Sequence, residues 1–137
     1  WFVRLALDGG EIQVYGDGTQ IRDFVHVDDV SDAFLRAGCS DACNGDVFNV
    51  GGHQPIAHRD LVSMLIEEAG RGSTRFVPWP EEKRKIDIGS FYSDSSKFTA
   101  TTGWRPRVDL RAGLRDTLAF YRAHFDRYVT AEAGVPS

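Results

Sequence analysis

Apolar residues recur along this chain in short segments whose spacing changes several times between a strand-like and a helix-like pattern. Alternating or continuous apolar residues over a few positions are typical of strands, and a proline pushes the residue before it out of the helical region. We therefore predict strands or extended chain at five places. They are residues 12–15, 24–27, 47–50, 75–80 and 90–93.

Helical spacing, with apolar residues three or four positions apart, fills the intervals between these segments. Aspartates are expected to cap the helix N-termini, and glycines to close the C-termini. This mixture of short strands and helices predicts one domain of the α/β or α+β class. The predicted helices are residues 1–7 closed by Gly9 and Gly10, the stretch from the caps Asp28 and Asp29 to Gly38, and the stretches from Pro55 to Gly70, Asp94 to Gly103 and Asp109 to Phe125.

Composition narrows the classes of partner. The chain has 137 residues, and its 16 lysines and arginines against 20 aspartates and glutamates give a formal net charge of −4. A net negative charge disfavours a nonspecific grip on nucleic acid or an anionic membrane. No apolar run approaches the roughly 20 residues of a membrane span, and the N-terminus lacks a signal-peptide pattern. We expect a cytoplasmic protein whose Cys39 and Cys43 are reduced thiols.

Motifs of common catalytic sites are missing from the sequence. There is no GxGxxG loop and no GxxxxGK[ST] loop, and none of the four tyrosines is followed four positions later by lysine. Binding chemistry is therefore expected here, not catalysis. The chain also opens on Trp1 without a methionine, within a predicted helix. We expect that the front of a larger protein is missing.

Two arginine–aspartate combinations are the main candidates for a ligand site. Arg22 directly precedes Asp23, and Arg84 stands three positions before Asp87. Arginine meets phosphate oxygens through a planar fork of donors, and a carboxylate accepts hydrogen bonds from vicinal hydroxyls, so the two combinations suit a nucleoside diphosphate. Two alternatives stay open. Arg22 could be structural and paired with Asp23 or Asp28, and the charged run around Arg84 could simply be solvated.

Three further side chains attract attention, each with an ordinary structural alternative. Asn49 follows apolar strand residues and precedes two glycines, which makes it a buried polar candidate for hydrogen bonding to a ligand or to its own loop. Tyr15 could stack on a nucleobase, although an aromatic at a strand end usually belongs to the core. His26 is more typical of a core histidine than of a catalytic base.

In this order, the segments resemble the C-terminal part of the extended short-chain dehydrogenase/reductase family of nucleotide-sugar epimerases, 4,6-dehydratases and decarboxylases. The resemblance reaches to about Arg127 and rests on IQVYGDGTQIRDFVHVDDV, VFNVGG, RKIDIGSFYSDSSK and TGWRPRVDL. It implies an α/β fold, the substrate-binding part of a Rossmann-type enzyme. Residues 1–128 would form the nucleotide-sugar-binding domain, and residues 129–137 a flexible tail.

The resemblance also implies which residues contact the nucleotide. Val14 and Tyr15 fall where the family contacts the nucleobase. Arg22 and Arg84 fall where it binds the diphosphate. Asp87 falls where members similar to UDP-galactose 4-epimerase hold the ribose hydroxyls.

Two more positions are implied for the sugar. Asn49 lies near the nucleotide-sugar site of some members. Phe91 matches the position that lines the sugar pocket, where a large ring suggests a preference for sugars without an N-acetyl group.

The activity that the resemblance implies belongs to a longer protein. Such enzymes oxidise the sugar at C4 with tightly held NAD, using a tyrosine base, a lysine and a serine or threonine. Those residues and the NAD-binding loop lie in the N-terminal Rossmann half, which this chain lacks. The expected full-length protein is an NAD-dependent epimerase or dehydratase similar to UDP-glucose 4-epimerase, acting on a nucleotide-diphosphate sugar, with a homodimer as a further expectation. The fragment would be inactive alone.

Removal of that half would also expose apolar side chains that normally pack against it, namely Val25, Val27, Val30 and Phe34. The alternative from another functional class is a non-enzymatic, stand-alone module from a truncated gene. Such a module would retain only nucleotide binding or dimerisation.

Overall fold

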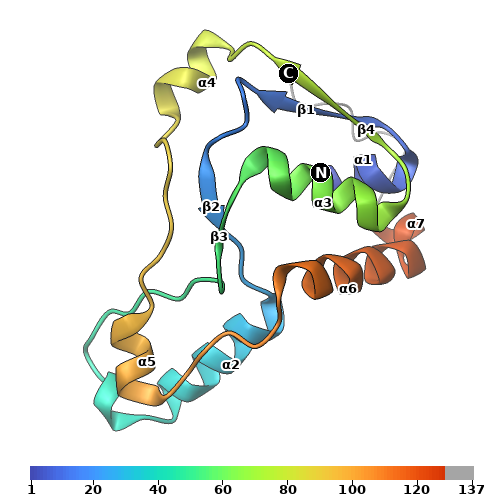
Figure 1. Ribbon diagram of the computed structural model, residues 1–137. Coiled ribbons are helices and arrows are strands. Elements are labelled where there is room, and N and C mark those ends of the chain that lie inside the picture. Colours follow the sequence, from blue (N-terminus) through green and yellow to red (C-terminus); the bar gives the residue numbers. More distant parts are fainter. Residues whose placement is uncertain (129–137) are drawn as a thin grey trace.

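Short strands and helices alternate in the computed structural model, which describes residues 1–128 (Figure 1). The predicted α/β class is confirmed. The helices are α1 (Phe2–Asp8), α2 (Val27–Gly38), α3 (His58–Ala69), α4 (Glu81–Ile86), α5 (Ser96–Thr102), α6 (Leu110–Ala123) and α7 (Phe125–Tyr128), with a short 3₁₀ helix at Asp41–Cys43. The strands are β1 (Glu11–Tyr15), β2 (Ile21–Asp23), β3 (Pro55–Ala57) and β4 (Ser73–Val77).

The strands form two small sheets of two strands each. β1 pairs in parallel with β4, with Val14 opposite Phe76. β2 pairs antiparallel with β3, with Arg22 opposite Ile56. Because β3 runs directly into α3, the β2–β3 pair connects the first sheet to the rest of the chain (Figure 1).

The larger core lies between β1 and the helices α1, α3 and α6. Ile12 and Val14 point inward from β1 and are fully buried, as the alternation at residues 12–15 predicts. Leu65 of α3 and Leu118 of α6 pack in the same cluster. Each such side chain stabilises the fold by roughly 1.5–3 kcal/mol. This core fixes the end of β1, where Tyr15 lies.

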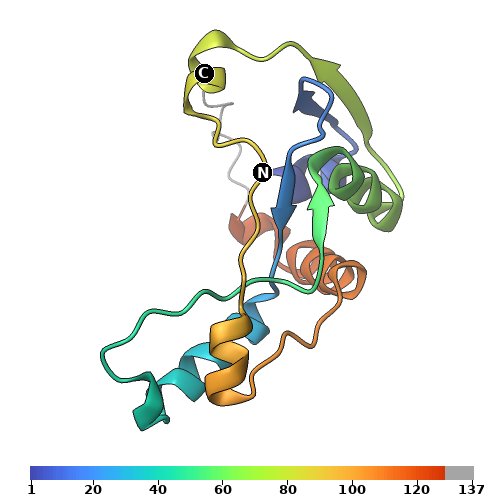
Figure 2. The same cartoon turned by 60° about the vertical axis from the view of Figure 1, so that its left-hand side comes forward.

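A smaller core forms around Phe98 of α5 and Trp104, against α2. Asp29 links these parts, because its carbonyl oxygen accepts a hydrogen bond from the Trp104 indole at 3.1 Å. Asp29 is only 4% exposed, and its carboxylate accepts hydrogen bonds from the backbone N–H groups of Arg107 and Val108, both at 3.0 Å. The two cores lie at opposite ends of the molecule, and β2 with its neighbouring segments spans the distance between them (Figures 1 and 2).

The predicted strand at residues 24–27 is wrong. The strand lies earlier, at β2, and α2 already begins at Val27. His26 caps this helix instead of the predicted aspartates, because its Nδ1 accepts the backbone N–H of Asp28 at 3.3 Å. The side chain of Asp29 is held by the segment after α5, a tertiary contact that local sequence does not reveal.

The predicted strand at residues 47–50 is also wrong. The segment is irregular, and Val47 is 81% exposed. Phe48 and Val50 pack against the smaller core, so the apolar run marks contact with α5 and not pairing with another strand. Lys97 of α5 fixes the segment further, since its ammonium group contacts the Asp46 carboxylate at 2.5 Å and the Val47 carbonyl oxygen at 3.1 Å.

The charged run at residues 81–86 forms the helix α4, which the sequence patterns did not predict. Pro80 stands at its N-cap, and Glu81 pairs with Lys85 at 3.2 Å within the helix. Residues 90–93 form no regular strand. The backbone N–H of Phe91 nevertheless donates to the Ile21 carbonyl oxygen at 2.9 Å, so this segment runs beside β2.

Two of the four apolar side chains that were expected to be exposed, both on α2, are exposed in the structure. Val27 is 67% exposed and Phe34 75%, while Val25 and Val30 are half-buried. Next to the start of α2 lies an open apolar groove of about 1100 Å³, between the first residues of the chain, residues 24–28 and α6.

No helix within residues 1–128 is long and apolar enough to cross a membrane. The predicted tail at residues 129–137 lies outside the described residues.

Candidate functional site

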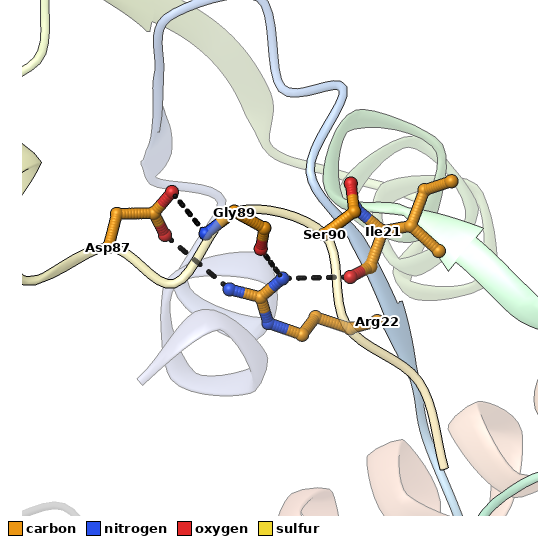
Figure 3. A network of polar contacts seen from close by, with 5 residues as sticks. All are labelled: Ile21, Arg22, Asp87, Gly89 and Ser90. Atoms are coloured by element: carbon orange, nitrogen blue, oxygen red, sulfur yellow. Dashed lines mark hydrogen bonds and ion pairs between the residues drawn. The ribbon is translucent and has the colours of Figure 1, made fainter. Parts of the chain in front are cut away.

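Arg22 of β2 meets a segment that follows α4, and this contact is the centre of the candidate site (Figure 3). One terminal nitrogen of the guanidinium donates to the carbonyl oxygens of Ile21, at 2.8 Å, and of Gly89. The other lies 3.5 Å from the carboxylate of Asp87. The structural alternative named Asp23 or Asp28 as the partner of Arg22, and the structure shows Asp87 instead.

The carboxylate of Asp87 is itself held in place, because it accepts the backbone N–H of Gly89 at 3.1 Å (Figure 3). The side chains of Arg22 and Asp87 remain 30% and 23% exposed. A cation and an anion therefore lie side by side within reach of a ligand, and the backbone between Asp87 and Gly89 fixes both.

The segment of residues 87–93, here called the strap, is tied to β2 along its length. The backbone N–H of Ile21 donates to the Ser90 hydroxyl at 3.1 Å, on the opposite edge of β2 from β3. At the far end of the strap, the backbone N–H of Ser93 donates to the Asp23 carboxylate at 3.1 Å. Arg22 and Asp23 thus hold successive parts of one segment, which explains why the two residues stand together in the sequence.

Gly51 and Gly52 allow a third segment to cross β2 at the same place. A Cβ atom on Gly51 would overlap the Asp23 carboxylate and lie 2.8 Å from the Ser93 side chain. A Cβ atom on Gly52 would overlap the Phe24 carbonyl oxygen. The paired glycines of VFNVGG are therefore required by close packing around Asp23.

Tyr15 lies at the end of β1 and contacts Trp79, just before α4, and Lys83 of α4. Its ring packs against Trp79, with centroids 5.3 Å apart and a tilt of 37°. Its hydroxyl accepts a hydrogen bond from the Lys83 ammonium at 3.0 Å, and this bond raises the pKa of Lys83. Gly16 makes room for this packing, because a Cβ there would lie 2.6 Å from the Trp79 indole nitrogen.

Arg84, the second predicted phosphate ligand, lies on α4 with an exposed side chain. Its backbone N–H donates to the Pro80 carbonyl oxygen at 2.9 Å. Among the described residues, the Arg84 side chain makes no hydrogen bond or ion pair. The structure thus brings Arg22 and Asp87 together directly. Arg84 lies within α4, three residues before Asp87, which follows the last residue of that helix.

The remaining predicted site residues are placed differently. Val14 is fully buried, so its side chain is not accessible to a ligand. Asn49 is exposed in an irregular loop, and the prediction of a buried polar strand residue is wrong. Phe91 lies on the strap and is 54% exposed, which leaves its ring open to a ligand.

His58, at the start of α3, has a pKa that is shifted by its surroundings, which include the charge of Arg22. Burial lowers the pKa of its imidazole below the ordinary value, and the positive charge of Arg22 lowers it further. The ring also stacks on Phe2, with centroids 5.3 Å apart. His58 therefore favours the neutral form beside the guanidinium.

Sequence reasoning missed the contributions of Trp79, Lys83, Gly89 and Ser90. The signal for Gly89 was available, since a glycine two positions after an aspartate suits a turn with positive φ, and its φ is 68°. Nothing in the local sequence indicated that Lys83 and Trp79 reach Tyr15, because these contacts join residues far apart in the chain.

Neither a metal nor a dinucleotide fits the described residues. No group of three or more histidine, cysteine, aspartate or glutamate side chains gathers within residues 1–128. No glycine-rich loop leads from a strand into a helix in this part of the chain, and β3 joins α3 without any loop. The pyrophosphate of NAD would need such a loop.

The sequence is similar to known nucleotide-sugar enzymes. The model of the NAD dependent epimerase/dehydratase family matches residues 1–51. A dTDP-glucose 4,6-dehydratase of Streptomyces griseus is 35% identical over 125 residues, which make up 90% of this chain and 37% of the relative.

Two solved structures share the fold. A UDP-glucose 4-epimerase of Thermotoga maritima, solved with UDP-glucose, has a TM-score of 0.80 and 30% identity, over 90% of this chain and 38% of its own. A dTDP-glucose 4,6-dehydratase of Streptomyces venezuelae, solved with NAD, has a TM-score of 0.79 and 28% identity, over 93% of this chain and 38% of its own. The resemblance to NAD-dependent sugar epimerases and dehydratases is confirmed, and the chain spans 37–38% of these relatives.

Proposed function

We propose that this chain is the nucleotide-sugar-binding part of an NAD-dependent epimerase or dehydratase, similar to UDP-glucose 4-epimerase. Residues 1–128 are its binding domain, and the ligand is a nucleoside-diphosphate sugar. NAD and the catalytic tyrosine and lysine belong to the part of the enzyme that this chain does not match. The chain contributes affinity and orientation, not the chemical step.

The contact between Arg22 and Asp87 carries this proposal. The guanidinium offers paired donors to phosphate oxygens, and the carboxylate offers acceptors to the two ribose hydroxyls. In a nucleoside diphosphate, the ribose and the diphosphate are adjacent, as the two side chains are. Both side chains are partly exposed, with 3.5 Å between their nearest charged atoms.

The other predicted residues extend the site in both directions. Arg84 supplies a second cation for the diphosphate. Tyr15, with the backbone of Val14, contacts the nucleobase. Asn49 and Phe91 lie toward the sugar, and the exposed ring of Phe91 limits bulk at the sugar C2 position.

Binding at this site serves catalysis by holding the sugar C4 against the reacting groups of the whole enzyme. Binding energy from the nucleotide, which does not react, is used to orient the part that does. The exposed apolar side of α2 and the neighbouring groove provide surface on which the NAD-binding half would pack.

The direct test is an activity assay on the full-length protein encoded by the gene. UDP-glucose and dTDP-glucose are each incubated with the protein and NAD, and the nucleotide sugars are separated to detect 4-epimerisation or 4,6-dehydration. The proposal predicts conversion of at least one of them. It is rejected if neither these nor other common nucleotide sugars are converted.

A further inference from the structure

We propose that Lys83 is a positioning residue of the nucleotide site, which acts through Arg84 by fastening α4 to the hydroxyl of Tyr15. This inference rests on the proposed function, because it assigns Arg84 to the diphosphate. Lys83 itself has no predicted contact with the ligand.

The helix α4 has little to hold it in place by itself. It is six residues long, has no buried residue and lacks a side-chain cap at its N-terminus. Helices shorter than about 12 residues are marginal in water without tertiary packing. The Glu81–Lys85 ion pair lies within the helix and is largely exposed, so it does not fix the helix to the rest of the molecule.

Contacts on either side of Arg84 fasten α4 and its flanks to the strands. Upstream, Tyr15 at the end of β1 packs against Trp79 and accepts the hydrogen bond of Lys83 at 3.0 Å. Downstream, Arg22 of β2 contacts Asp87 at 3.5 Å. Figure 1 shows the result, with α4 held at the top of the view between the end of β4 and the strap.

Arg84 lies between these two anchors and has no side-chain contact among the described residues. Its reach toward a diphosphate is therefore set by where α4 sits. On a helix, consecutive side chains point about 100° apart, since 3.6 residues complete a turn. In a regular helix, Arg84 therefore projects about 100° away from the side on which Lys83 bonds to Tyr15.

The contact with Tyr15 is made through its hydroxyl. The Lys83 ammonium lies 3.0 Å from that oxygen and 5.2 Å from the ring centroid, so the hydrogen bond is the shorter and more specific contact. Substitution of phenylalanine for Tyr15 removes this bond and keeps the ring that would touch a nucleobase. The effect of the Lys83–Tyr15 hydrogen bond can therefore be measured separately from the contact of the Tyr15 ring with a nucleobase.

The experiment measures UDP and dTDP affinity by titration calorimetry, and KM and kcat with the nucleotide sugar that the full-length protein converts. The variants are K83M, K83R, Y15F and R84A, with the doubles K83M/R84A and K83M/Y15F. K85M is the matched control, because it removes the same charge from the same helix and touches only Glu81.

Loss of one hydrogen bond predicts an affinity roughly three- to tenfold weaker in K83M and in Y15F. KM should rise to match while kcat stays unchanged. K83M should add nothing in the R84A or the Y15F background, K83R should restore most of the affinity, and K85M should change it less than about twofold.

Several results overturn the inference while the proposed nucleotide-sugar activity still stands. They are wild-type affinity in K83M and Y15F, an unchanged affinity in R84A, or a K83M effect of equal size in the R84A background, which would mean that Lys83 acts on the ligand itself. If K83M does not fold, Y15F and K83R decide by the same criteria. Failure of the wild-type protein to bind or convert any nucleotide sugar rejects the proposed function, and the inference with it.

Discussion

The guanidinium of Arg22 lies 3.5 Å from the carboxylate of Asp87, although 65 positions separate the two residues in the sequence. The pair joins the strand β2 to the strap, and both side chains stay partly exposed. Under the proposed function, a nucleoside diphosphate would offer phosphate oxygens to the first and ribose hydroxyls to the second.

Replacement of Arg22 tests the cationic half of this pair. We expect R22A to reduce nucleoside-diphosphate binding by about 2–5 kcal/mol, the scale for removal of one member of a desolvated charge pair. R22K keeps the charge but loses the planar fork, so its loss should be intermediate. Calorimetric titration of the full-length protein measures both. A loss below about 0.5 kcal/mol in R22A would mean that Arg22 serves only the fold.

Replacement of Asp87 by asparagine tests the ribose half. The amide cannot accept from two hydroxyls as a carboxylate does, and hydrogen bonds to charged groups contribute about 1.5–3 kcal/mol, so UDP should bind correspondingly less tightly. Inorganic pyrophosphate has no ribose, and its affinity for D87N should be equal to or higher than for the wild-type protein. Equal weakening of both ligands would show that Asp87 only orients Arg22.

Substitution of alanine for Gly52 tests the close packing around Asp23. The added Cβ would overlap the Phe24 carbonyl oxygen, a backbone atom that cannot swing away. We expect a loss of at least about 1–3 kcal/mol in stability, seen as a lower melting temperature. G38A is the control, because a Cβ at the end of α2 meets nothing within 4 Å. Equal melting temperatures for G52A and wild type would contradict the crossing geometry.

The pH dependence of stability tests the environment of His58. Burial, and then the charge of Arg22, lower its pKa below the ordinary value of 6.5. The unfolded chain therefore binds the proton at higher pH than the folded protein. Stability is fully present above pH 6.5 and declines as the pH falls from there toward the lowered pKa.

Thermal melting at a series of pH values should show this decline, and H58Q should reduce it. H53Q, a substitution at an exposed histidine outside this contact, is the matched control variant. The pKa values of Asp17, Asp46 and Asp94 are also lowered. Their contribution to stability is lost only below about pH 3.8, so it does not overlap the pH range of His58. If H58Q loses stability with falling pH just as the wild-type protein does, His58 is not the source of the decline.

Local pattern predicted five of the helices, α1, α2, α3, α5 and α6, and the first strand, because their signals are contained in neighbouring residues. The alternation at residues 12–15, the left-handed glycines at the ends of α1, α3 and α5, and the Asp109 cap of α6 are all found in the structure. Each depends on backbone geometry or burial within a few positions.

The errors concern segments that are fixed by distant partners. Asp29 resembles a helix cap, yet it is used by the backbone at residues 107 and 108. The apolar run at residues 47–50 resembles a strand, yet it packs on α5 without a strand partner. The pairing of Arg22 with Asp87 depends on how the strap returns beside β2, which no local pattern records. The assignment of these residues to a nucleotide rests on the chemistry of the arginine–aspartate combinations and on the family resemblance, and it stays a prediction.

A structure of the full-length protein with bound UDP or dTDP tests the central claim most directly. We predict that the Arg22 guanidinium contacts the diphosphate, that Arg84 approaches the same phosphates from α4, and that the Asp87 carboxylate accepts from the ribose hydroxyls. The claim is contradicted if the nucleotide binds elsewhere, or if it binds here while Arg22 contacts only Asp87 and the Gly89 and Ile21 carbonyl groups.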